Sequence, residues 1–157
     1  MSPLFTLPKS FTVITIFAVP LAKAVGAKGK IYAIDVQRQV LDVVRAKAKK
    51  EHLANIEALW ADLEHPKGLP IAHDFLDFVL IANILFQCEN KVGLLKEAYR
   101  LLTSRGRLAI IEWSAEGGPL GPPAGMRVNK EKLKEVAGKI GFSFQRNFEA
   151  GREHYGI

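Results

Sequence analysis

Three polar residues stand at the ends of apolar segments that have the character of β-strands. Asp35 closes the segment KIYAID, Asp62 closes NIEALWAD, and Asn83 lies near the end of DFVLIANIL. In an open parallel sheet, ligands bind beyond the carboxyl ends of the strands, near the point where the strand order reverses. These three positions are therefore candidate binding residues.

Each candidate has a functional and a structural interpretation. A carboxylate at Asp35 can accept hydrogen bonds from both hydroxyl groups of a ribose, or it can start the next helix, where negative charge suits the helix dipole. Asp62 is either an acceptor for an adenine amino group or the cap of a loop turn. Asn83 either contacts a ligand or satisfies backbone groups at a crossover.

The sequence identifies no catalytic residue. There is no Ser/His/Asp arrangement, no pair of carboxylates and no Walker-type loop. Glu112 and Trp113 close the strand-like segment RGRLAIIEW, and Trp113 is interpreted as a packing residue. Cys88 is the only cysteine, which excludes an intrachain disulfide, favours a reducing cytoplasm and indicates an inert core thiol. The histidines at positions 52, 65, 73 and 154 lack metal-ligand spacing, so we expect no metal.

The composition is that of a globular protein. Of 157 residues, 48% are hydrophobic and 24% are charged. The net charge of +6 could suit nucleic acid, but the basic residues of RAKAKKEH and NKEKLKEVAGK alternate with acids as on solvated helix faces. The apolar run from Phe11 to Leu21 followed by AKA imitates a secretory signal, yet it is too short to span a bilayer. We expect a cytoplasmic protein with neither a membrane nor a nucleic-acid partner.

Apolar segments alternate with amphipathic ones, which predicts a largely parallel sheet covered by helices on both faces. Asn90 and Asn129 are expected to cap the last two helices. Segment 114–128 is rich in Gly and Pro and is expected to be a flexible loop without regular structure. The predicted strands are 30–35, 55–62, 77–85, 105–113 and an edge strand marked by Phe142, Phe144 and Phe148. The predicted helices are 18–26, 37–51, 91–102 and 130–140.

Five sequence blocks together resemble a class I S-adenosylmethionine-dependent methyltransferase, and in particular the methyltransferase type 11 domains. They are FAVPLAKAVGAKGKIYAIDVQ, ADLEHPKGLP, DFVLIANILFQCENKVGLLKEAYRLL, GRLAIIEW and GFSFQRNFEAGREHYG. The resemblance implies a doubly wound, Rossmann-like α/β sheet of order 3-2-1-4-5-7-6, with an antiparallel seventh strand and here an incomplete last strand. We expect one domain over residues 1–157.

The resemblance also implies S-adenosylmethionine as the cofactor and a small molecule as the methyl acceptor. It leaves the oligomeric state open. It assigns the cofactor to residues at three strand ends: Asp35 and Val36 at the ribose, Asp62 and Leu63 at the adenine, and Asn83, Ile84 and Leu85 near the methionine.

The front of the chain, residues 1–16, departs from the family pattern. An ungapped overlay places the family's G-x-G-x-G on Phe11, Val13 and Thr15, and its acidic residue on Lys9. Glycines allow positive φ and a close approach of the backbone to the ligand, which bulky and β-branched residues resist. FTVITIF has strand character instead. We predict that residues 11–17 form the first strand and that cofactor binding is impaired.

Three functions follow. The first is methyl transfer by in-line displacement, for which the enzyme mainly positions a nucleophile and a dedicated base is optional. The second is a methyltransferase-like domain without cofactor binding, as an interaction partner or an incomplete gene product. The third is a nicotinamide dinucleotide enzyme, which Asp35 fits but which lacks its glycine fingerprint.

Overall fold

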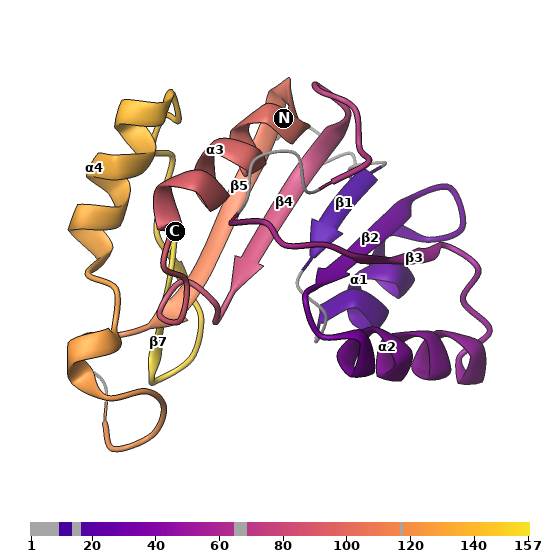
Figure 1. Cartoon of the computed structure of the whole chain (residues 1–157), viewed down its shortest axis with the longest axis horizontal. Coiled ribbons are helices and arrows are strands. Elements are labelled where there is room, and N and C mark those ends of the chain that lie inside the picture. Colours follow the sequence, from indigo (N-terminus) through magenta and orange to yellow (C-terminus); the bar gives the residue numbers. More distant parts are fainter. Residues whose placement is uncertain (1–9, 14–16, 65–68, 117) are drawn as a thin grey trace, which may run out of the picture.

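A seven-stranded sheet organises the chain, as seen in the computed structural model, which describes residues 10–13, 17–64, 69–116 and 118–157 (Figure 1). Its order is β3-β2-β1-β4-β5-β7-β6, the order that the resemblance implies. The strands are β1 (Ser10–Val13), β2 (Lys30–Asp35), β3 (Ile56–Trp60), β4 (Leu76–Ala82), β5 (Leu102–Trp113), β6 (Phe148–Glu149) and β7 (His154–Gly156). Strands β1 to β5 pair in parallel, whereas β7 runs antiparallel to β5 and β6.

In the described part of the chain, four α-helices accompany the sheet, and each begins within one residue of its predicted position. Asn90 and Asn129 cap α3 and α4 as expected, since each side chain accepts from the backbone N–H three residues on, at 2.8 and 3.0 Å. The helices are α1 (Ala18–Val25), α2 (Arg38–Lys50), α3 (Lys91–Leu101) and α4 (Lys130–Ile140).

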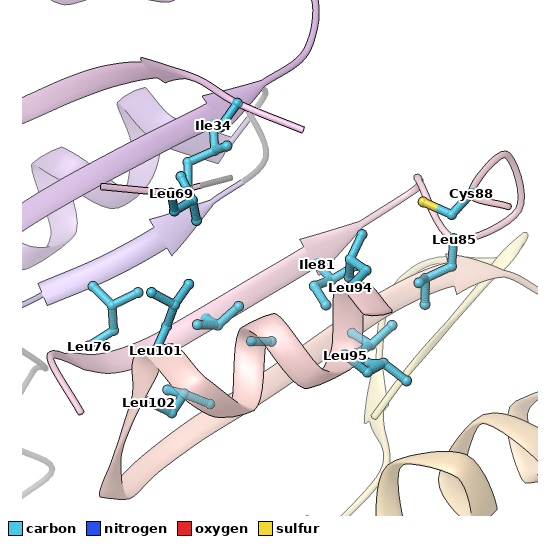
Figure 2. Packing of buried hydrophobic residues seen from close by; sticks show 14 of the residues in the cluster. Ile34, Leu69, Leu76, Ile81, Leu85, Cys88, Leu94, Leu95, Leu101 and Leu102 are labelled. Atoms are coloured by element: carbon cyan, nitrogen blue, oxygen red, sulfur yellow. The ribbon is translucent and has the colours of Figure 1, made fainter. Parts of the chain in front are cut away.

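The two faces of the sheet carry separate apolar clusters, because successive side chains of a strand point to opposite faces. On β2, Ile31 and Ala33 belong to the cluster under α1 and α2, whereas Ile34 belongs to the cluster under α3 and α4. Figure 2 shows the second cluster, in which buried leucines of α3 lie over β4. The sheet is thus covered on both faces, as the alternating pattern predicts.

The predicted first strand is confirmed in part. Residues 11–13 belong to β1, whereas residues 14–16 lie outside the described residues. Phe17 is not a strand residue, because it is the N-cap of α1 with φ −91° and ψ −3°. The helix can start directly after Phe17 because Pro20 lies in its first turn, where a backbone N–H has no helical partner.

Three strand boundaries were predicted incorrectly. β3 ends at Trp60 rather than at residue 62, because Asp62 belongs to the following turn, where its side chain accepts from the N–H of Glu64. β4 ends at Ala82 rather than at residue 85, because Asn83 takes a left-handed φ of 55° that leaves the strand conformation. β5 begins at Leu102 rather than at residue 105, because Leu102 is extended at the end of α3 and pairs with Leu76 before the register shifts.

The predicted edge strand from Phe142 to Phe148 is wrong except at its end, where Phe148 belongs to β6. The three aromatic rings do not share a buried face. Phe142 packs edge-on against Tyr99 of α3, with ring centroids 5.1 Å apart. Phe144 is 55% exposed, with the Lys134 ammonium 4.3 Å from its ring centroid.

Candidate functional site

The carboxyl ends of β1 to β5 lie along one edge of the sheet, because these strands are parallel. Along the chain the strands progress outward from β1 to β3 and then cross to β4, so the order reverses between β1 and β4. Asp35 is the last residue of β2, Asp62 follows β3, and Asn83 directly follows β4. The structure therefore brings all three candidate residues to one edge, on both sides of the switch point.

Asp35 makes the contact expected from its structural interpretation. Its Oδ1 accepts from the backbone N–H of Gln37, the N-cap residue of α2, at 2.8 Å. This contact uses one acceptor position of the carboxylate, and the ribose contact of Asp35 stays a prediction. Val36, also assigned to the ribose, is 52% exposed.

Trp60, at the end of β3, is a feature that the sequence interpretation missed. Its indole N–H donates to the carbonyl of Val36 at 2.7 Å, and the Arg38 guanidinium lies 4.4 Å from its ring centroid. The indole remains 54% exposed. Its hydrogen bond links the end of β3 to the residue after β2, and its exposed ring lies beside Asp35.

Asp62 also makes a turn contact, because its Oδ1 accepts from the N–H of Glu64 at 2.9 Å. The Glu64 carboxylate in turn accepts from the backbone N–H of Asn90, the α3 cap, at 2.6 Å. Leu63, between them, is half-buried against the cluster under α3. The loop after β3 is thereby tied to the start of α3.

Asn83 has an unsatisfied side chain. Its backbone N–H donates to the carbonyl of Ile111 at 2.9 Å, which continues the pairing of β4 with β5. Its side-chain Oδ1 is buried and has no hydrogen-bond partner in the described part of the chain. Of its neighbours, Ile84 is half-buried and Leu85 fully buried. The structural interpretation of this side chain, in which it satisfies backbone groups, therefore does not account for Oδ1.

Glu112 fixes the backbone that follows Asn83. It is fully buried on β5, and its Oε1 accepts from the N–H of Leu85 at 2.8 Å while Oε2 accepts from its neighbour Trp113 at 3.4 Å. Burial raises the pKa of the carboxyl group, and these backbone donors oppose that rise. Glu112 is thus a buried anchor for the loop between β4 and α3.

Trp113 and His154 close the edge beyond β5. They are opposite residues of β5 and β7, and their ring centroids lie 4.2 Å apart at an interplanar angle of 38°. Trp113 is therefore a packing residue, as predicted. The Nε2 atom of His154 is buried without a partner among the described residues. Its place at this edge follows from the antiparallel direction of β7, which the resemblance implies. No sequence spacing, however, singled out His154.

Cys88 is a core residue, as expected, and lies beside Leu85 beyond the end of β4 (Figure 2). Burial raises the pKa of its thiol to about 12, so the thiolate needed for nucleophilic attack is scarce at neutral pH. In the described ranges, no three His, Cys, Asp or Glu side chains are grouped as metal ligands, and no helix is long and apolar enough to cross a membrane.

A surface hollow of about 530 Å³ lies at the opposite edge of the sheet, beside the start of β2. Lys23, Lys28 and Lys30 line it. Two of these ammonium groups are paired, Lys23 with Glu51 at 2.8 Å and Lys30 with Glu57 at 2.5 Å. The hollow lies away from the candidate residues, and its paired charges are typical of a solvated rim.

Residues 15–110 match a family model described as a methyltransferase domain. The match begins beyond Phe11 and Val13, the first two positions at which the family glycines were expected. Among solved structures, a SAM-dependent methyltransferase from Aquifex aeolicus is similar with a TM-score of 0.83 and 28% identity, over 94% of this chain and 79% of that one.

Curated relatives are also similar to this chain. A demethylmenaquinone methyltransferase of Geobacillus sp. (strain WCH70) is 29% identical over 98 residues, which cover 62% of this chain and 41% of the relative. The ubiquinone/menaquinone biosynthesis C-methyltransferase UbiE of Haemophilus ducreyi is 32% identical over 99 residues, covering 62% and 37%. The chain thus spans less than half the length of these relatives.

Proposed function

The chain belongs to the family of methyltransferase domains, and we propose that it transfers a methyl group from S-adenosylmethionine to a small aromatic acceptor. The cofactor would lie at the carboxyl edge of the sheet, across the switch point between β1 and β4. When bound, its sulfonium supplies a methyl group together with the leaving group. The protein's own task is then to hold the cofactor and to align a nucleophile with that methyl group.

The observation that carries this proposal is the buried, unpartnered Oδ1 of Asn83. A buried acceptor without a hydrogen bond costs about 1–3 kcal/mol, which a ligand donor would recover. The cofactor's methionine part carries an ammonium group, a donor of the required kind. Asp35 and Asp62 supply acceptors for the ribose and the adenine. The residues at this edge fit the cofactor.

One part of the site, at β1, fits the cofactor poorly. Phe11 and Val13 pair with β2 and β4, so this backbone is committed to the sheet where the family has glycines. This arrangement supports a weak rather than a tight cofactor site. The alternative function, a domain of this fold without cofactor binding, rests on the same observation.

The acceptor class follows from the names of the relatives, one a demethylmenaquinone methyltransferase and the other a C-methyltransferase of ubiquinone/menaquinone biosynthesis. A quinone ring is electron-poor, whereas its reduced hydroquinone form has a nucleophilic ring carbon. We therefore propose a hydroquinone as the acceptor. Neither metal nor redox chemistry enters this step, because the methyl group is transferred as a cation equivalent.

Isothermal titration with S-adenosylmethionine tests the proposal. We expect weak binding by the wild-type chain and about tenfold or greater weakening in Asp35→Asn, because the ribose loses a hydrogen bond to a charged acceptor. Asp42→Asn, on the exposed part of α2, is the matched control and should bind like wild type. No binding by wild type at millimolar cofactor would reject the proposal and favour the alternative.

A further inference from the structure

Two buried side-chain atoms lack a hydrogen-bond partner in the described part of the chain, Asn83 Oδ1 and His154 Nε2. Both lie at the carboxyl edge of the sheet, one on each side of the end of β5. Asn83 follows β4, and His154 is opposite Trp113 at the start of β7. The Oδ1 atom is explained by the proposed cofactor. The Nε2 atom has no explanation yet, and its place indicates a second ligand at the same edge.

The imidazole of His154 is held in position from several sides. Its backbone belongs to β7, and its ring lies against the Trp113 indole. The preceding residue, Glu153, accepts from the N–H of Ser114 with its carbonyl at 2.8 Å and from Gly118 with its carboxylate at 2.5 Å. His154 is therefore a positioned group rather than a surface side chain.

The neighbouring charged groups of β5 and β7 point away from this ring. Glu112 and Tyr155 form the adjacent pair in the register, so their side chains lie on the opposite face of the sheet. The carboxylate of Glu153 is engaged by Gly118. The imidazole thus lies against an aromatic ring, and its buried Nε2 has no hydrogen-bond partner among the described residues. An uncommitted acceptor nitrogen is what a general base needs.

We propose that His154 is a catalytic residue of the methyl transfer: its Nε2 accepts the hydroxyl proton of a hydroquinone bound at this carboxyl edge of the sheet. This inference rests on the proposed function and adds to it the base that the sequence did not identify. Deprotonating the hydroxyl raises the electron density of the adjacent ring carbon, which is the atom that attacks.

The step balances as follows for a hydroquinone. The hydroxyl proton moves to Nε2 while the neighbouring ring carbon forms a bond to the methyl carbon, and the bonding pair of the broken carbon–sulfur bond stays on sulfur. The ring then carries a ketone and one surplus C–H. That hydrogen is lost from carbon and a proton is restored to oxygen, which regenerates the hydroquinone. The imidazolium of His154 finally releases its proton to water.

Binding to His154 can be measured without the cofactor. In chain labelled with 15N-histidine, the Nε2 resonance of His154, assigned by its absence in His154→Gln, is followed on adding 1,4-dihydroxynaphthalene under argon. We expect this resonance to shift with the diol and not with 1,4-dimethoxynaphthalene, which has the same ring without a hydroxyl proton. No response to the diol, or an equal response to both compounds, would overturn the inference.

Methyl transfer provides the second measurement. With labelled S-adenosylmethionine and the diol, His154→Gln should lower kcat by about 10²-fold or more, with cofactor affinity unchanged. In His154→Gly, added imidazole should restore part of the rate, which a merely structural role does not predict. His73→Gln, an exposed histidine before β4, is the matched control. A His154→Gln rate within about twofold of wild type would contradict the proposed role.

The two proposals can fail separately. Cofactor binding without any response of His154 to the diol rejects this inference and leaves the proposed function standing. A His154 response to the diol in a chain that binds no cofactor rejects methyl transfer instead.

Discussion

At the residue scale, Glu112 shows how a buried carboxyl group can hold a neighbouring loop in place. Its carboxyl group is fully buried, which raises its pKa, yet it accepts from the backbone of Leu85 and Trp113. These bonds fix the loop that begins with Asn83, beside the proposed cofactor. A neutral amide of the same shape, as in glutamine, would remove the cost of burying a charge. It would, however, place an N–H₂ donor against a backbone N–H donor.

The raised pKa of Glu112 predicts a pH dependence of stability. Between about pH 4.3, the usual pKa of Glu, and the higher pKa in the folded protein, the folded state binds more protons than the unfolded chain. The free energy of unfolding should therefore fall as the pH rises through this window and then level off. Glu112→Gln should lack this component and lose about 1–3 kcal/mol of stability, because its amide N–H₂ faces backbone donors.

Urea denaturation between pH 4 and 8 gives the free energy of unfolding of wild type and of Glu112→Gln. The difference between their pH profiles is the contribution of the Glu112 carboxyl group. Glu149→Gln, an exposed residue of β6, is the control and should retain the wild-type slope. Parallel pH profiles of wild type and Glu112→Gln would show that the buried carboxyl group does not titrate as inferred.

At the scale of elements, residues 114–116 and 118–127, here called the strap, are linked by hydrogen bonds to a single side chain, that of Arg127. The expectation of no regular structure is wrong for Ala124–Met126, which form the short 3₁₀ helix η2. The guanidinium of Arg127 donates to four backbone carbonyls of the strap at 2.8 to 3.0 Å. These carbonyls belong to Ser114, Gly118, Leu120 and Pro122. Composition predicted a loop but did not predict its organising side chain.

Gly121 places the strap against Trp113. It has a φ of 90°, and a Cβ at this position would come within 2.4 Å of the indole ring. Only glycine permits both the backbone conformation and this approach. The strap therefore rests on the tryptophan that also contacts His154, which connects it to the proposed acceptor site.

Arg127→Lys should loosen the strap. A lysine ammonium has three donors at one point and cannot reach four carbonyls as the planar guanidinium does. We expect hydrogen exchange of the strap amides to accelerate about tenfold, which corresponds to about 1.4 kcal/mol of local stability. The exchange of α3 should not change. Arg146→Lys, an exposed residue, serves as the control; unchanged strap protection in Arg127→Lys would contradict the assigned role.

At the scale of the whole molecule, β1 joins the two halves of the sheet. It pairs with β2 through residues 10–13 and with β4 through residues 11–13. From the sequence alone, glycines at positions 11, 13 and 15 would be expected to create or strengthen cofactor binding. The structure changes that expectation for Phe11 and Val13, since both are strand residues; Thr15 lies outside the described residues.

Phe11→Gly with Val13→Gly should destabilise the protein without improving the cofactor site. Each glycine in a strand costs about 0.5–1 kcal/mol of backbone entropy, and the double variant also loses two apolar side chains. Urea denaturation should show a loss of more than about 1 kcal/mol, and titration should show no gain in S-adenosylmethionine affinity. Thr15→Gly is the comparison variant, as it adds no glycine to β1. Tighter cofactor binding by the double variant would contradict the assignment of β1.

The sequence predicted most of the elements because local rules decide them. The strand at 30–35 and the Asn90 and Asn129 caps depend on neighbours within a few residues, and they are confirmed. The errors arose where distant contacts decide. Asn83 leaves the strand with a left-handed φ, and Phe142 turns toward Tyr99 of α3 instead of continuing an edge strand.

The sequence by itself determined the α/β class, the alternation of strands and helices, and the presence of polar residues at strand ends. These features depend on periodicity and capping, which involve residues only a few positions apart. Only the tertiary structure decided which of those residues share an edge and which atoms there remain unpaired. Asp35 and Asp62 turned out to support local turns, whereas His154, which no spacing singled out, was brought beside Trp113 by an antiparallel strand. Hydrogen-bond satisfaction and strand direction depend on pairing between distant segments, which no local pattern records.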